Sequence, residues 1–167
     1  LMKMAERFGL PVVTFSEDIS FHLNGDSLNA IHVPHAHTDG DSFIYFKKAN
    51  VIHAGDIFFN GFYPFIDVTH GGSLKGMIKA ADKILSLADD KTKIIPGHGP
   101  MGDKAQLAGY RQMLWTAYER LRKLKAEGKT AQEAVAHAAC ALARDLSSAN
   151  IFVPARSGNT ARLLSKF

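Results

Sequence analysis

The sequence has very little cysteine and no long hydrophobic run, and both shortages narrow what the protein can be. Its 167 residues include one cysteine, Cys140, so an internal disulfide framework is excluded. No apolar run reaches the length of a membrane span, and no signal-peptide pattern opens the chain. We therefore expect no membrane partner and favour a cytoplasmic location. The first residue is Leu1, so the true N-terminus could lie upstream.

Charge is unevenly distributed along the chain, although the formal net charge is only +4. Residues 1–103 hold nine Lys and Arg against twelve Asp and Glu, whereas residues 104–167 hold eleven against four. The basic part lacks the interleaved aromatic residues of a base-stacking surface. A solvated helix face explains it better than a nucleic-acid partner does.

The pattern of apolar residues predicts short strands followed by helices, in one domain with its own core. Asn24-Gly25-Asp26 is typical of a hairpin turn between two strands. An aromatic stretch at 57–66, interrupted by Gly61 and Pro64, is predicted to be irregular; it would wall a substrate pocket or pack over the sheet edge. The predicted strands are 19–23, 27–33, 42–46, 51–53 and 93–95.

Capping residues predict where the helices begin and end. Ser73 and Asp103 are expected to be N-caps, Gly128 a stop, and Thr130-Ala-Gln-Glu133 a capping box. We predict one domain over residues 1–145 and an irregular tail over 146–167. The predicted helices are 1–8, 74–88, 104–127 and 130–144.

Three short motifs place metal-ligand residue types where apolar strands run into glycine-containing turns. They are His-Ala-His-Thr-Asp-Gly-Asp at 35–41, Ala-Gly-Asp at 54–56 and Pro-Gly-His-Gly-Pro at 96–100. Strand ends can meet at one rim of a sheet, and imidazole with carboxylate is a common coordination set for zinc or iron. We therefore predict that His37, Asp56 and His98 are metal ligands.

In this order the motifs resemble the metallo-β-lactamase superfamily, and specifically its second half, over roughly residues 10–128. The resemblance implies an α/β fold: half of an αββα sandwich, with a mostly antiparallel or mixed sheet and helices on one face. In the complete family fold, two similar halves related by approximate two-fold symmetry cover each other's sheets. The His-x-His-x-Asp-His motif of the first half does not occur in this chain.

The same resemblance implies a function and assigns roles. It implies a zinc-dependent hydrolase, with Fe or Mn as alternative metals, in which His37 binds one metal, His98 a second, and Asp56 bridges them. Because the other ligands belong to the absent half, the isolated chain is expected to be inactive or weakly active on a small-molecule substrate. The alternative is a non-catalytic metal-binding or assembly domain. A homodimer is expected, because a half domain alone would expose its inner sheet face.

Other residues near the motifs leave alternatives open. His35-x-His37-x-Asp39 could instead begin the first-half motif, with Gly40 replacing its last histidine, but the chain behind it is too short for the rest of the fold. Asp39 and Asp41 either orient an imidazole or stabilise the turn.

Several further residues have no predicted role as ligands. His53 lies three residues before Asp56, so strand alternation places it on the opposite face. The remaining residues without a ligand-like context are His22, His32, His70, His137 and Cys140.

Overall fold

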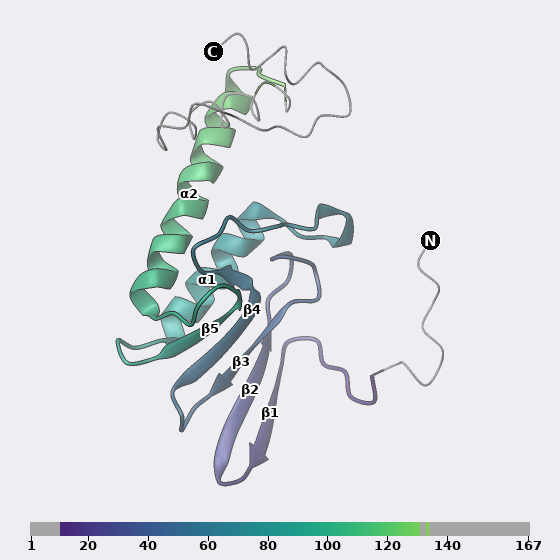
Figure 1. Cartoon of the computed structure of the whole chain (residues 1–167). Coiled ribbons are helices and arrows are strands. Elements are labelled where there is room, and N and C mark those ends of the chain that lie inside the picture. Colours follow the sequence, from purple (N-terminus) through teal and green to yellow (C-terminus); the bar gives the residue numbers. More distant parts are fainter. Residues whose placement is uncertain (1–10, 131–132, 134–167) are drawn as a thin grey trace. The chain divides into compact units, whose positions relative to one another are not determined.

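The computed structural model describes residues 11–130 and 133, in two compact units that divide between Trp115 and Thr116. The first unit holds a five-stranded sheet in the order β1-β2-β3-β4-β5, with β1 to β4 antiparallel and β5 parallel to β4 (Figure 1). The strands are β1 (Asp18–Leu23), β2 (Asp26–His32), β3 (Ser42–Phe46), β4 (Val51–Phe59) and β5 (Lys93–His98). The helices are η2 (Val68–His70), α1 (Leu74–Leu87) and α2 (Lys104–Ala126).

The β1–β2 hairpin follows from the chemistry of its two turn residues. Asn24 and Gly25 both have positive φ, 54° and 72°, as a type I′ turn requires, and Leu23 pairs with Asp26 across it. The predicted turn is confirmed, with β2 starting one residue earlier than expected.

β4 and β5 continue well past their predicted ends. β4 continues from His53 to Phe59 because the bend at Gly55 (φ 55°) shifts the register and lets the strand carry on. Residues 57–59, predicted to be irregular, therefore belong to the strand. β5 continues through Pro96, which the ladder accepts because β5 is at the edge of the described sheet.

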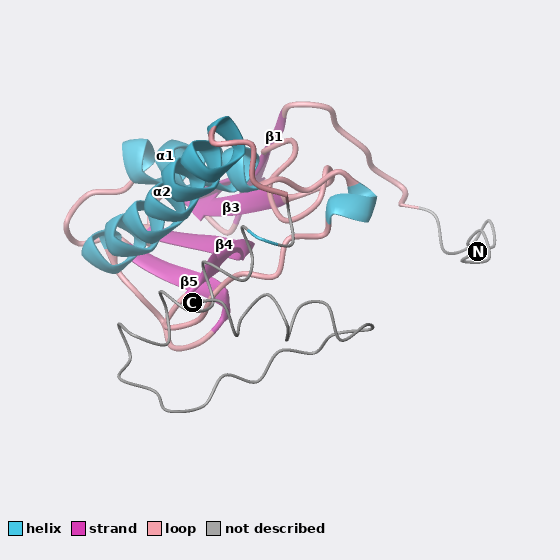
Figure 2. Ribbon diagram, turned by 90° about the horizontal axis from the view of Figure 1, so that it is seen from above, coloured by secondary structure: helices cyan, strands magenta, loops and turns pink. Residues whose placement is uncertain are grey.

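The core lies between the sheet and helices packed on one face, as predicted for an α/β half-sandwich. Figure 2 shows α1 and the part of α2 that belongs to the first unit on the same side of the strands. A large apolar side chain stabilises the fold by about 1.5–3 kcal/mol when it is fully buried. The largest fully buried apolar side chains of the first unit are Phe43, Ile52, Ile57, Phe58, Met77, Ile84, Ile94, Leu107 and Leu114.

The opposite side of the sheet is apolar and lacks a covering layer among the described residues. The strand register places Ile19, Ile44 and Ile95 in one row across this face, with His53 between the last two. We call this surface the open face. Its other apolar members are Phe21, Leu23, Leu28, Phe46 and Val51, all exposed or half-buried.

The helix caps confirm most of the predicted boundaries. The Ser73 hydroxyl accepts the Gly76 N–H at 3.0 Å, and the Asp103 carboxylate accepts the Gln106 N–H at 2.8 Å. In the second unit α2 ends at Ala126, one residue before the predicted end.

The predicted stop and capping box in the second unit also form. Gly128 takes a positive φ of 72°. Thr130 and Glu133 make the reciprocal bonds of a capping box, with the Glu133 N–H donating to Thr130 Oγ1 at 3.2 Å.

Some predictions differ from the structure or lie beyond it. Trp115 flanks the apolar stripe of the predicted helix at 104–127, which favours a core position, but it is 39% exposed, and the Arg111 guanidinium lies over its ring at 5.1 Å. The predicted helix at 1–8, nearly all of the helix at 130–144 and the tail at 146–167 lie outside the described residues. No helix among the residues described is long and apolar enough to cross a membrane.

Candidate metal centre

His37 lies in the loop between β2 and β3, with one ring nitrogen held by the backbone. Its Nδ1 is 2.8 Å from the carbonyl oxygen of Phe65. A carbonyl oxygen can only accept, so Nδ1 must carry the hydrogen and donate it. The ring is thereby oriented with Nε2 towards Asp56, at 3.6 Å from Oδ2. This backbone bond is the arrangement that prepares a histidine to bind a metal through its other nitrogen.

Asp56 stands between two imidazoles, one on each carboxylate oxygen. Its Oδ1 is 3.6 Å from Nε2 of His98, as Oδ2 is from Nε2 of His37. The carboxylate fits closely against the backbone of β5. A Cβ added to Gly97 would lie 2.0 Å from Asp56 Oδ1, so a residue with a side chain there would displace the carboxylate.

His98 ends β5 and is held by β4 beside it. The Phe59 ring stacks on the imidazole with centroids 4.8 Å apart and planes 16° apart. The Asn60 N–H donates to the His98 carbonyl at 2.9 Å. The next residue, Gly99, has φ 96°, and a Cβ there would lie 2.1 Å from the Asn60 carbonyl oxygen. The Pro-Gly-His-Gly turn therefore needs both glycines to approach β4.

The structure brings the three predicted residues together, but not as a complete binding group. The 3.6 Å separations exceed hydrogen-bond length, and the two imidazoles meet different oxygens of the carboxylate. Within residues 11–130 and 133, no three His, Cys, Asp or Glu side chains form a group that could hold a metal ion by themselves. The donor types and the orientation of His37 fit a metal site. The number of ligands, however, is smaller than a complete metal site needs.

The residues around His37 stabilise its turn and do not orient its ring. His35 Nδ1 is 3.2 Å from Asp39 Oδ1 and 3.0 Å from the Gly71 carbonyl oxygen. The Asp41 carboxylate accepts the Thr38 N–H at 2.7 Å. Of the two roles left open for Asp39 and Asp41, the observed bonds support turn stabilisation, because the Phe65 carbonyl holds the His37 ring.

The described histidines without a predicted ligand role have other partners or surroundings, and His137 and Cys140 lie outside the described residues. His53 is exposed on the open face. His22 bonds to Ser27, and His70 Nδ1 is 2.7 Å from the Asp67 carboxylate.

Sequence reasoning missed two contributors to the site. The Phe65 carbonyl is a backbone atom of the aromatic loop, which no residue-type pattern reveals. The second is Tyr110 of α2, whose side chain is buried. Burial raises the Tyr110 pKa above its usual range and the Asp56 charge raises it further, whereas the Phe59 backbone lowers it. The neutral phenol thus lies within the electrostatic reach of Asp56.

Comparisons with known proteins agree with this arrangement of motifs. Residues 3–98 match the family model described as the metallo-beta-lactamase superfamily. A search of curated proteins gave no match.

Solved structures with a similar fold include several metallo-β-lactamases. The metallo-beta-lactamase from Pontibacter korlensis is 23% identical with a TM-score of 0.56, over 64% of this chain and 50% of that chain. The metallo-β-lactamase DIM-1 is 20% identical with a TM-score of 0.51, over 61% and 47%. For TMB-1 the identity is 16% and the TM-score 0.52, over 63% and 47%. The chain thus spans about half the length of these proteins.

Proposed function

The chain belongs to the metallo-β-lactamase superfamily, and on that premise we propose that it supplies half of a metal-dependent hydrolytic site. His37, Asp56 and His98 are the proposed metal ligands. Zinc is the proposed metal, with Fe or Mn as alternatives, because imidazole nitrogen and carboxylate oxygen suit all three. Whatever the metal, the reaction class is hydrolysis of a small molecule.

The observation that carries this proposal is the Asp56 carboxylate between two imidazole Nε2 atoms, each 3.6 Å from a different oxygen. The Phe65 carbonyl leaves Nε2 as the free coordinating nitrogen of His37. Such an arrangement suits two cations that share one carboxylate. In a complete two-metal site His37 would hold the first, His98 the second, and Asp56 would bridge them. In the isolated chain the three residues would share one metal.

The metal, when bound, would supply Lewis-acid chemistry for the attack of water on the substrate. The chain's own residues would position it. Phe59 keeps the His98 imidazole from rotating by stacking on it, and Gly97 gives the Asp56 carboxylate room beside β5. The described half supplies three ligands at most. We therefore expect the isolated chain to turn over substrate slowly or not at all.

A second candidate function is a non-catalytic metal-binding or assembly domain. It is supported by the lack of any complete ligand group among residues 11–130 and 133. A hydrolysis screen with a lactone, a thioester and a β-lactam separates the two candidates. Metal-dependent turnover that disappears in Asp56→Ala would favour the enzyme, and metal binding without turnover would favour the second candidate.

Elemental analysis of the purified chain tests the proposed ligands. We expect about one zinc or iron per chain, because three ligands hold one metal ion more readily than they hold two metal ions. His98→Ala should lose most of this metal. The matched control is His53→Ala, which removes an exposed imidazole from the open face. This variant should keep its bound metal. Undiminished metal in His98→Ala would refute the ligand assignment.

A further inference from the structure

We propose that a neutral pocket beside His98 binds the apolar acyl or aromatic group of an ester, thioester or lactone substrate. This inference rests on the proposed hydrolytic function and adds the substrate class. The pocket has a volume of about 310 Å³ and lies between the end of β4, the loop after it and the first half of α2. An apolar cavity of about 150 Å³ can hold a benzene ring, so the pocket has room for one ring and its linker.

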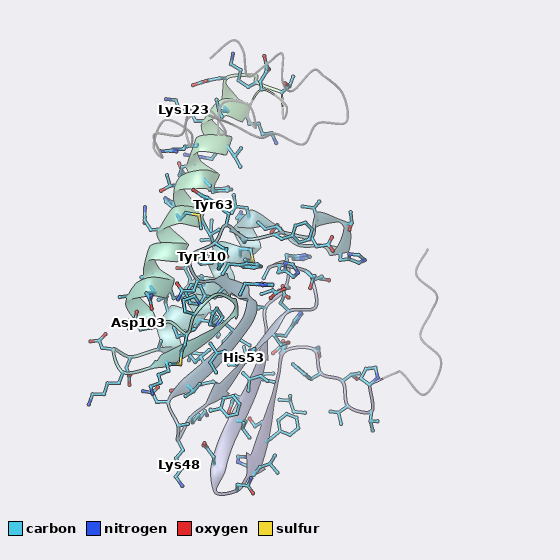
Figure 3. The ribbon with its side chains drawn as sticks, in the orientation of Figure 1. Lys48, His53, Tyr63, Asp103, Tyr110 and Lys123 are labelled. Carbon is cyan, nitrogen blue, oxygen red and sulfur yellow. The ribbon has the colours of Figure 1, made fainter. Side chains whose placement is uncertain are left out.

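The wall of the pocket is largely aromatic, and part of it is exposed before any ligand binds. Phe62 is 60% exposed and Tyr63 is 64% exposed, although both are large and apolar. Tyr110 and Met113 of α2 form the opposite wall, and Tyr63 and Tyr110 are labelled in Figure 3. Exposed aromatic side chains at the mouth of a pocket are typical of a binding site for apolar groups.

The lining carries no formal charge, which restricts the ligand. None of the residues that line the pocket is Lys, Arg, Asp, Glu or His. Its two amide side chains already have partners: Asn60 Nδ2 donates to the Pro100 carbonyl at 2.9 Å, and Gln106 Oε1 accepts the Asp103 N–H at 3.2 Å. A phosphate or carboxylate would find no compensating charge here. The pocket therefore favours a neutral substrate group over a nucleotide or another phosphodiester.

The pocket shares a wall with the proposed metal site. Phe59 lines the pocket and stacks on the His98 imidazole at 4.8 Å. Tyr110 also lines it, and its hydroxyl lies within the electrostatic influence of Asp56. A substrate with its apolar group in the pocket would thus have its carbonyl near Asp56. Hydrolysis would add the oxygen of water to the carbonyl carbon and break the bond to the alcohol or thiol, which leaves with a proton.

The test is binding of 4-phenyl-2-butanone, a neutral ketone that has a ring and a carbonyl but cannot be hydrolysed. We would titrate the full chain by NMR without added metal, so the result is independent of the metal analysis above. The variants are the double substitution Phe62→Ala with Tyr63→Ala, and Met113→Glu, which brings a charge into the pocket. The matched control is Phe15→Ala, an exposed phenylalanine outside the pocket.

We expect saturable binding at millimolar concentration, weakened about tenfold in the double variant and in Met113→Glu, and unchanged in Phe15→Ala. 2-Butanone, which lacks the ring, should bind at least tenfold more weakly than the phenyl ketone. Equal binding of the phenyl ketone by wild type and double variant would overturn the proposal. So would the absence of saturable binding, or stronger binding of an anionic probe such as phenylphosphonate at the same residues.

Discussion

At the scale of single residues, Gly97 controls whether Asp56 can stand between the two imidazoles. A Cβ at this position would lie 2.0 Å from Asp56 Oδ1 and 2.7 Å from the Gly55 carbonyl carbon. Gly97→Ala should therefore displace the carboxylate, reduce bound metal severalfold and lower the free energy of unfolding by about 1–3 kcal/mol. Elemental analysis and urea denaturation measure both effects.

The control for this substitution is Gly109→Ala in the first unit. Apart from the adjacent residues and the backbone of its own helix turn, no atom lies within 4 Å of a Cβ added to Gly109. The substitution should keep the metal and stabilise α2 by about 0.5–1 kcal/mol, because alanine is the better helix former. Metal content that stays at the wild-type level in Gly97→Ala would contradict the observed fit of Asp56 against β5.

His32 is expected to make stability depend on pH. Its Nε2 is 2.7 Å from the Asp39 carbonyl oxygen and its Nδ1 is 2.9 Å from the Ser16 carbonyl oxygen, so both nitrogens must donate. The hydrogen bond to the Asp39 carbonyl is the main cause that raises the His32 pKa above 6.5, and desolvation partly opposes it. The Ser16 carbonyl and the charges of Asp39 and Asp41 raise the pKa further.

Since the His32 pKa is raised in the folded state, the stabilisation that protonated His32 contributes to the fold is complete below about pH 6.5. It is lost as pH rises through the folded-state pKa. The urea midpoint of the wild type should therefore fall between pH 6 and pH 8.5. In His32→Asn it should fall less over the same interval. An NMR titration that places the His32 pKa below 6.5 would show that the charged form is not favoured.

The sequence predicted three candidate metal ligands, which lie near one another in the structure, but not what orients them. The sequence pattern placed His37, Asp56 and His98 after strands at glycine turns, which can be read without the fold, although Asp56 lies inside β4 and His98 is the last residue of β5. The Phe65 carbonyl that holds His37 lies 28 residues away along the chain. Tyr110, whose pKa the Asp56 charge raises, comes from α2, far along the chain from Asp56. Contacts of this range depend on tertiary packing, which local patterns do not encode.

At the scale of elements, the cap of α1 connects the helix to the motif turn. The Ser73 hydroxyl accepts the Gly76 N–H and donates to the His35 carbonyl, both at 3.0 Å. Ser73→Ala should lower the free energy of unfolding by about 1 kcal/mol or somewhat more, because both bonds are lost.

Ser86→Ala is the matched control, since its hydroxyl bonds only to the Lys83 carbonyl within the same helix. Its effect should stay within about 0.5 kcal/mol. Equal losses in the two variants, measured by urea denaturation, would mean that the Ser73 cap contributes nothing specific.

Element ends were less predictable than element types. The hairpin and both helix caps follow from local chemistry at Asn24-Gly25, Ser73 and Asp103. By contrast, glycine and proline normally interrupt strands, so β4 was expected to stop at His53 and β5 at Ile95. The two strands pair with each other through Gly55 and Pro96 instead. Pairing between strands about 40 residues apart overrides the local signal of these residues.

At the scale of the whole molecule, the open face needs a cover, and we propose that a second copy of the chain provides it. The face carries eight apolar residues that are exposed or half-buried, Ile19 and Ile44 among them. Burying them would contribute on the order of 10 kcal/mol, comparable with the stability of a typical domain. In the complete family fold a second, similar sheet occupies this position, and symmetric dimers are the commonest oligomers.

Light scattering on a size-exclusion column measures the assembly. We expect about twice the chain mass of 18.2 kDa at micromolar concentration. Ile44→Lys should shift the mass towards the monomer, because it places a charge on the open face. Val68→Lys, an exposed position outside that face, should not. A single species of 18.2 kDa in the wild type would contradict the proposal.

The central claim is that His37 and His98 coordinate metal through Nε2 on either side of Asp56. The most direct measurement is NMR of the histidine ring nitrogens in the full chain during a zinc titration. We predict that the Nε2 signals of these two residues move together on zinc addition, while Nδ1 of His37 keeps its hydrogen because it donates to Phe65. His53 should not respond. Zinc-dependent shifts at His35 or His53, with His37 and His98 unchanged, would contradict the account.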